Sequence, residues 1–405
     1  MINYTLSPAT LSTGSAGVSS CVPDAASASG AAGAVSSSLG TIANLPSTPL
    51  GSQKNNGGER RVLRFALQSS ARELLPRERV ASCLRRPIPS RPTVDVFLSA
   101  AHHTAHYGGL QVCGSVWACP VCSAKVTERR RLELAAGTKF WREEAGGFLL
   151  LVTYTLRHNY RDNLLDVLSA LLGAFEGVHS GRWWVQFADT HRIIGKLRSL
   201  EVTHGDSGWH PHIHVLYFIG SGELPGVVGF ETALRDRWLH QLARLGRDAS
   251  WANGVDVRMS DAAIADYIAK YAKEPTWTIE HEMTKAPVKL AKSGGRTAFQ
   301  LLNEYMLGDE AAGRLFLQYA LNFKGKNQLA WSRGLRTILR LDQEKTDIEI
   351  ANEMEDDAQL LAQLTRDQWR VILANDARAE LLNIAVTGDV DAFWSFVNKL
   401  IGGVN

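Results

Sequence analysis

The stretch His210-Pro211-His212-Ile213-His214-Val215-Leu216 decides the interpretation of the central part of this 405-residue chain. Successive side chains of a β-strand point to opposite faces, so the three histidines of such a strand share one face. Imidazoles two residues apart lie about 7 Å from each other and can reach one divalent ion. The opposite face carries apolar side chains into a core, namely Ile213, Val215, Tyr217 and Ile219. The stretch therefore predicts a strand with a metal-binding face, the alternative being a solvated face of histidines.

The segment before this strand offers a third metal ligand. Residues 197–203 predict another strand, and Gly205-Asp206-Ser207-Gly208 is typical of a turn that joins two strands as a hairpin. Mg²⁺ and Mn²⁺ prefer oxygen ligands, and a hairpin can place Glu201 beside His212 or His214. Glu201 is therefore the predicted third ligand, although the sequence does not fix the register of the hairpin. Weaker candidates near the turn are His204 and Asp206.

Patterns typical of strands and of helices alternate around this hairpin. The further predicted strands are residues 148–156 and 255–259, and the predicted helices are 163–179, 231–245 and about 261–273. This order of elements, with an antiparallel hairpin among them, predicts an α+β domain over residues 145–341 with helices on one face of the sheet.

The flanks of this domain differ in composition. Residues 1–58 are rich in Ser, Ala, Gly, Thr and Pro and are predicted to be disordered. Residues 59–144 are predicted to hold a basic arm, with nine Arg against three Glu over 59–91, then a cysteine-rich segment and a helix. Residues 342–405 predict an all-helical acidic tail, with thirteen Asp and Glu against five Lys and Arg. A basic body suits a polyanion-binding protein, although a basic linker beside an ordinary acidic tail explains the charge equally well.

The chain shows no sign of export or membrane insertion. It has no run of 18 apolar residues, and its N-terminus has no basic start followed by an apolar core. Its five cysteines are an odd number, and three of them fall within ten residues. This distribution argues against a disulfide framework and predicts a reducing interior.

The cysteine-rich segment predicts a structural metal site. Cys113, Cys119 and Cys122 include a CxxC pair and precede a basic helix that carries Arg129-Arg130-Arg131, an arrangement that resembles a zinc knuckle. A closed tetrahedral zinc site needs a fourth ligand, for which His106 is the predicted residue. Other candidates for this ligand are Cys83, His102 and His103, and the alternative is a set of buried free cysteines.

Two tyrosines provide a candidate nucleophile. Tyr267-Ile268-Ala269-Lys270-Tyr271 places two phenols four residues apart, on one face of the predicted helix. A phenol with a pKa of about 10 attacks poorly by itself, and a nearby divalent ion together with Lys270 or Lys273 would lower the barrier. The same spacing, extended to Ile264, is also the ordinary stripe by which a helix packs on its core.

These motifs, in this order, resemble those of the replication initiators of rolling-circle plasmids, within the wider class of HUH endonucleases. The resemblance covers residues 110–340. The matching segments are CGSVWACPVCSAK (113–125), VTYTL (152–156), HPHIHVL (210–216), YIAKY (267–271), and FKGK (323–326) through WSRGL (331–335).

The resemblance implies an HUH-type antiparallel sheet with flanking helices and a catalytic Mg²⁺ or Mn²⁺ on His212 and His214. It implies that Tyr271 cuts one DNA strand and forms a 5′-phosphotyrosine. Many plasmid members carry a glutamate where this chain has Tyr267. The chain therefore resembles the two-tyrosine arrangement, in which a second transesterification ends the reaction.

The implied partners are the double-strand origin of a plasmid, with its nick site presented as a single strand, and the host helicase and DNA polymerase. The implied location is the bacterial cytoplasm. Three alternatives stay open at this point. They are a two-tyrosine transposase, a histidine-triad nucleotide hydrolase with a histidine nucleophile, and a zinc-dependent DNA-binding regulator.

Overall fold

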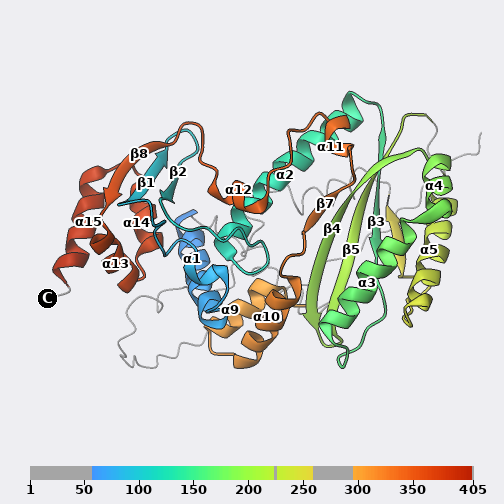
Figure 1. Cartoon of the computed structure of the whole chain (residues 1–405), viewed down its shortest axis with the longest axis horizontal. Helices are drawn as coiled ribbons and strands as arrows, with labels where there is room; N and C mark the ends of the chain where they lie inside the picture. The colour runs from blue at the N-terminus through green and yellow to red at the C-terminus, as the bar shows by residue number, and fades with distance from the viewer. Residues whose placement is uncertain (1–56, 223–225, 259–294, 404–405) are drawn as a thin grey trace, which may run out of the picture. The chain divides into compact units, whose positions relative to one another are not determined.

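The larger of two sheets is built around the predicted hairpin. The computed structural model describes residues 57–222, 226–258 and 295–403. Among them, a five-stranded sheet has the order β6-β3-β5-β4-β7, and every neighbouring pair is antiparallel (Figure 1). Its strands are β3 (Phe148–Tyr154), β4 (Ile193–Gly205), β5 (Gly208–Ile219), β6 (Val255–Arg258) and β7 (Leu329–Trp331). The histidine stretch therefore forms the central strand.

One face of this sheet is covered by three helices. They are α3 (Leu164–Val178), α4 (Gly181–Thr190) and α5 (Val227–Arg244). The β5 side chains that enter this core are Ile213, Val215, Tyr217 and Ile219, as their alternation predicts. Asn163 caps α3 by accepting a hydrogen bond from the backbone N–H of Leu165, which fixes where this leucine-rich helix begins.

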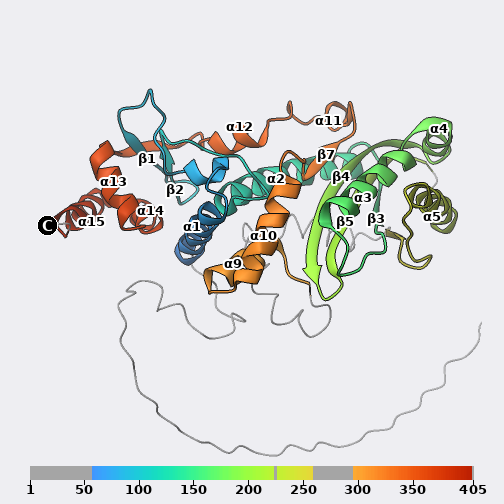
Figure 2. The same cartoon turned by 60° about the horizontal axis from the view of Figure 1, so that its bottom comes forward.

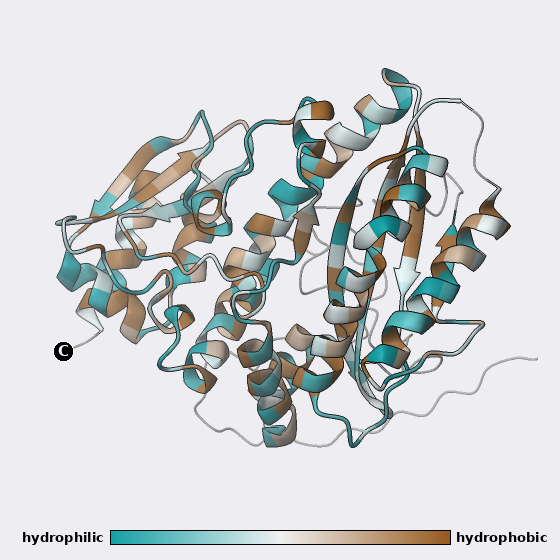
Figure 3. Cartoon of the chain, turned by 45° about the vertical axis from the view of Figure 1, so that its right-hand side comes forward, coloured by the Kyte–Doolittle hydropathy of each residue, from teal (hydrophilic) through white to brown (hydrophobic). Residues whose placement is uncertain are grey.

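The other face of the sheet is covered too. The long helix α2 (Pro120–Glu143) and the short α11 (Leu335–Ile338) pack there through Leu134, Trp141 and Leu335, against Leu216 and Phe218 of β5. The prediction of helices on one face was therefore wrong. The reason is visible in residues 215–219, a continuous apolar run of the kind found in strands that are buried on both faces. Figure 3 shows that the helices around this sheet carry both hydrophilic and hydrophobic residues.

A second, three-stranded sheet joins segments that lie far apart in the sequence. Its order is β2-β1-β8, where β1 is Val94–Ser99, β2 is Thr104–Gly108 and β8 is Gln359–Leu364. β8 pairs antiparallel with β1, and its Ala362 and Leu364 are buried. The prediction that residues 342–405 are all-helical was wrong for β8. The rest of that region is largely helical, with α12 (Asp347–Asn352), α13 (Arg366–Ala374), α14 (Arg378–Ala385) and α15 (Val390–Gly402).

The remaining described elements are α1 (Gly57–Leu74), the 3₁₀ turn η1 (Arg79–Ser82), α9 (Ala298–Met306) and α10 (Glu310–Phe323). α9 and α10 lie beside the turn end of the β4–β5 hairpin in both views (Figures 1 and 2). Trp209 of β5 donates a hydrogen bond to Gln318 of α10 at 2.8 Å, which fixes that contact. None of the helices in the described ranges combines the length and the hydrophobicity needed to cross a membrane.

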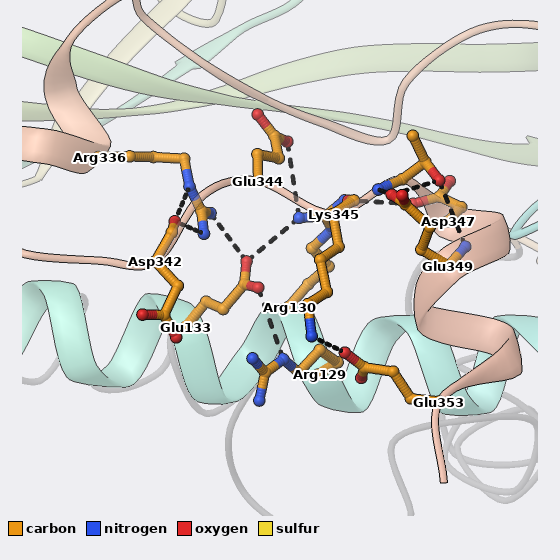
Figure 4. Close-up of polar contacts among 11 residues, drawn as sticks. Arg129, Arg130, Glu133, Arg336, Asp342, Glu344, Lys345, Asp347, Glu349 and Glu353 are labelled. Atoms are coloured by element: carbon orange, nitrogen blue, oxygen red, sulfur yellow. Dashed lines mark hydrogen bonds and ion pairs between the residues drawn. The ribbon is translucent and has the colours of Figure 1, made fainter.

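A charged network joins α2 to α11 and to the chain that follows it (Figure 4). The buried carboxylate of Glu133 accepts hydrogen bonds from Arg130 at 3.1 Å and from Arg336 at 2.9 Å. Arg130 also lies 3.5 Å from the carboxylate of Asp347 at the start of α12. Because these partly buried charges are paired and hydrogen-bonded, losing one partner would leave the other uncompensated.

Candidate active site and four-cysteine cluster

The hairpin register brings the three predicted ligands together. Glu201 on β4 lies directly opposite His212 on β5, and the turn between the strands is the two residues Asp206 and Ser207. The carboxylate of Glu201 is 3.1 Å from Nε2 of His212 and 3.5 Å from Nε2 of His214. The three ligand atoms lie within 4.8 Å of one another. The sequence left this register open, and the structure fixes it.

The electrostatics of this group favour a cation. Burial acts to raise the pKa of Glu201, but hydrogen bonds from His212 and His214 hold that pKa well below its ordinary value of 4.5. The carboxylate is therefore ionised at neutral pH. The side chains are 10–20% exposed, so the group is largely buried with a small part open to solvent. Two imidazoles and one carboxylate can hold a divalent ion and would leave open positions on an octahedral one.

Thr153 orients one of the imidazoles. This β3 residue is the Cα partner of His214, and its hydroxyl lies 2.9 Å from Nδ1 of His214. Because Nδ1 contacts Thr153, Nε2 is the ring nitrogen that faces Glu201. A hydrogen bond to the second ring nitrogen is the usual way in which the orientation of a metal-ligating histidine is fixed. Sequence reasoning missed Thr153. Alternation along the predicted strand 148–156 is compatible with Thr153 lying on the same face of the sheet as the histidines. Only the register between β3 and β5 shows that its partner is His214.

The third histidine of the strand has a different partner. Nδ1 of His210 lies 2.6 Å from Nε2 of His158, another residue that sequence reasoning missed. Burial first, then electrostatic interaction with the neighbouring imidazoles of His212 and His158, lowers the pKa of His210 to about 4. The two weaker candidates also lie outside the group of three. His204 pairs through its backbone with Arg296, and Asp206 is exposed in the turn.

The predicted nucleophile lies outside the described residues. This applies to Tyr267, Lys270 and Tyr271 alike. The last described residue before them is Arg258, which ends β6, the strand next to β3 in the sheet. Their roles therefore stay a prediction.

Four cysteines form a second candidate metal site. Cys83 follows η1, Cys113 lies in a loop, and Cys119 and Cys122 stand at the start of α2. The sulfurs of Cys83 and Cys122 are 3.5 Å apart, and those of Cys83 and Cys119 are 3.8 Å apart. A tetrahedral zinc ion with bonds of about 2.3 Å requires ligand separations of about 3.8 Å. All four residues are at most 5% exposed, so the cluster can hold a buried metal ion.

Backbone hydrogen-bond donors point at three of the four sulfurs. Backbone N–H groups of Cys113, Ser115 and Cys122 donate to the sulfurs of Cys83, Cys113 and Cys119 at 3.4–3.5 Å. Burial acts to raise the pKa of Cys119, but hydrogen bonds from the other three thiols bring that pKa well below 9.0. Hydrogen bonds within the same cluster raise the pKa of Cys113 and that of Cys122. Gly114 has a φ of +65° and packs against Ile348, and an added Cβ would lie 2.9 Å from the backbone of Ile348. Only glycine fits this turn of the cluster.

His106, the predicted fourth ligand, does not lie in this cluster. It is a β2 residue whose ring stacks on Phe97 at 5.5 Å between centroids. Burial, and then the charge of Lys125, lowers the pKa of His106 to about 4. The fourth sulfur comes from Cys83, one of the candidates that the sequence left open. Its distance of thirty residues from Cys113 hid the pairing.

Comparisons with known proteins identify the family of the chain. The chain matches the family described as Replication protein (Rep_1) over residues 109–377 and belongs to this family of replication proteins. It is 30% identical over 300 residues to the protein named Protein rep of Streptomyces lividans, covering 58% of this chain and 65% of that relative. It is 34% identical over 150 residues to a Streptomyces cyanogenus protein named Neomycin resistance protein, covering 31% and 34%.

The matches thus span less than two thirds of the length of these relatives. No solved structure matches the chain.

Proposed function

We propose that this chain is a plasmid replication initiator that nicks one strand of the replication origin and rejoins it through a 5′-phosphotyrosine. The observation that carries the proposal is the group of Glu201, His212 and His214 on the central hairpin of a chain that belongs to a replication protein family. Two imidazoles and an ionised carboxylate suit a metal that contacts a phosphate.

The chemistry divides between the metal ligands and the tyrosines. His212, His214 and Glu201 would hold Mg²⁺ or Mn²⁺, which when bound supplies polarisation of the scissile phosphate. The phenolic oxygen of Tyr271 attacks the phosphorus, forming a P–O bond, and the bond to the 3′-oxygen breaks. The phenolic proton leaves and the 3′-oxygen ends as a hydroxyl, which a host polymerase can extend. Lys270 offers its positive charge to the attacking oxygen.

The second tyrosine ends the cycle in this proposal. Tyr267 attacks the regenerated site, and the released 3′-hydroxyl displaces Tyr271 from the first phosphotyrosine. Each step exchanges one phosphodiester bond for another, so joining needs no ATP. Origin DNA is held largely through its phosphates by basic side chains, with the nick site as a single strand. The cysteine cluster has a structural role in this proposal, holding zinc.

The test is covalent trapping. Purified protein, Mn²⁺ and labelled single-stranded fragments that tile the DNA flanking its own gene are mixed, and a denaturing gel separates protein-bound label. Label on the 3′ side of the cut follows the protein if a 5′-phosphotyrosine forms. We expect the adduct to survive acid, which phosphohistidine does not. Tyr271→Phe abolishes it in our proposal, whereas full activity of Tyr271→Phe with loss in Tyr267→Phe would reverse the two roles.

A further inference from the structure

Arg378, the first residue of α14, is a buried cation with weak neutralisation. Its side chain is 0% exposed. Its nearest ion-pair partner is Asp376 at 3.5 Å, whose carboxylate is 52% exposed. Its Nε is buried without a hydrogen-bond partner, and the guanidinium lies over the ring of Phe65 at 4.8 Å. A positive charge that is buried to this extent is costly unless further negative charge lies nearby.

Two short routes lead from Arg378 to the cysteine cluster. Nη1 of Arg378 donates to the side-chain carbonyl of Gln68 at 2.8 Å, and the amide nitrogen of Gln68 donates to the sulfur of Cys119 at 3.2 Å. Nη1 also donates to the backbone carbonyl of Leu84 at 3.2 Å, next to Cys83. Gln68 is 1% exposed, so water does not screen the first route. The guanidinium is therefore linked to two of the four cysteine positions.

The metal-bound cluster would carry the negative charge that the guanidinium lacks. Four thiolates around one divalent ion carry a net charge of −2, which is costly in a buried site. Lys125 also lies near the cluster, but its ammonium donates to the backbone carbonyls of Ala351 and Glu353. Within the described part of the chain, Arg378 is the fully buried cation whose hydrogen bonds reach the sulfurs through one side chain.

We propose that Arg378 is a positioning and charge-balancing residue of the four-cysteine centre. Acting through Gln68 and the carbonyl of Leu84, its guanidinium offsets the negative charge of the metal-bound cluster and raises the affinity of the centre for a divalent metal. Metal binding is thereby coupled to the docking of the C-terminal helices, which deliver Arg378. The inference rests on the metal-binding part of the proposed function and does not depend on the nicking chemistry.

Competition for zinc tests the inference on the full-length zinc-loaded protein. A chromogenic chelator gives the zinc affinity of the wild type, Gln68→Leu and Arg378→Met. Because changes in residues that support metal ligands typically cost 10–100-fold in affinity, we expect both variants to weaken zinc binding by about that factor. Arg378→Lys keeps the charge but loses the forked geometry, so it should fall between the wild type and Arg378→Met.

Arg336→Met is the matched control. It removes another nearly buried arginine, which pairs with Glu133 at 2.9 Å and has an 11% exposed side chain. We expect a lower Tm with zinc affinity within about twofold of the wild type. A purely structural role for Arg378 would give the same pattern in Arg378→Met and Gln68→Leu, and would overturn the inference.

Cobalt substitution supplies a second readout. The sulfur-to-cobalt charge-transfer band of the Co²⁺ protein should shift when the hydrogen bond to Cys119 is lost in Gln68→Leu. If Arg378→Met does not fold, Gln68→Leu decides alone, because it leaves the guanidinium in place. A wild-type protein that binds neither Zn²⁺ nor Co²⁺ would overturn both the cysteine centre and this inference, whereas trapping of the phosphotyrosine adduct reports on the nicking proposal separately.

Discussion

The two candidate metal groups of this protein are opposites in design. Glu201, His212 and His214 come from two adjacent strands, mix nitrogen and oxygen donors, and are 10–20% exposed. The four cysteines come from three separate segments, offer sulfur alone, and are at most 5% exposed. Closed sulfur sites stabilise folds, and sites with open positions leave room for a substrate. In the proposed function, the first group takes part in the reaction and the second stabilises the fold.

The largest effect should come from breaking the closed site. We expect Cys83→Ser to lose the metal and at least ~3 kcal/mol of unfolding free energy, because a structural zinc ion contributes on the order of 10 kcal/mol to folding. Metal analysis and urea unfolding measure both quantities. Cys21→Ser is the matched control, since Cys21 is the remaining cysteine of the chain. Equal stability of the two variants would contradict a structural role for the cluster.

Breaking the open site should separate activity from stability. His214→Ala should lower Mn²⁺-dependent nicking by more than about 100-fold. Even the substitution of a residue that only supports a metal ligand typically lowers metal affinity or activity by 10–100-fold. Its Tm should stay close to that of the wild type. His240→Ala, which removes an exposed histidine of α5, should leave nicking unchanged. Nicking at the wild-type rate by His214→Ala would remove His214 from the proposed metal site.

A smaller effect should follow from loosening one ligand. Thr153→Val keeps the shape of the side chain but removes the hydroxyl at 2.9 Å from His214. We expect the Mn²⁺ concentration for half-maximal nicking to rise by about 10-fold. Thr153→Ser, which retains the hydroxyl, should restore most of the affinity. The same Mn²⁺ requirement in Thr153→Val and wild type would show that Thr153 does not orient the ligand.

The last effect is a loss of stability in acid, and it involves an imidazole that belongs to neither group. Burial, and then the charge of Lys196, lowers the pKa of His179 to about 3, while its Nε2 lies 2.6 Å from the hydroxyl of Tyr217. A histidine kept neutral by the fold contributes stability above its unfolded pKa of about 6.5 and loses it as pH falls from there toward 3. Each pH unit in that window costs at most ~1.4 kcal/mol.

Urea unfolding of the wild type and His179→Phe at pH 7, 6 and 5 isolates this contribution. The wild type should lose stability more steeply than the variant as the pH falls. Parallel losses in the two proteins would assign the acid sensitivity to other groups.

The part of the structure that could be predicted from the sequence differs between these regions. Alternation along 210–219 predicted the strand, its apolar face and the shared face of the histidines, because these depend on local geometry alone. The pairing of Glu201 with His212 depended on the hairpin register, which the sequence did not fix. The α+β class was confirmed, while β8 was missed because its partner β1 lies about 260 residues away. Cys83 was weighed but not chosen, since no spacing rule connects it to Cys113.

The pairing of β8 with β1 also sets when this protein can finish folding. β1 leaves the ribosome early, but its neighbour on that side is among the last segments to be translated. A polypeptide that ends before residue 359 lacks β8, so one edge of its β1 has no hydrogen-bonding partner. Such an unpaired edge favours aggregation. Completion of the polypeptide is thus a condition for closing the smaller sheet.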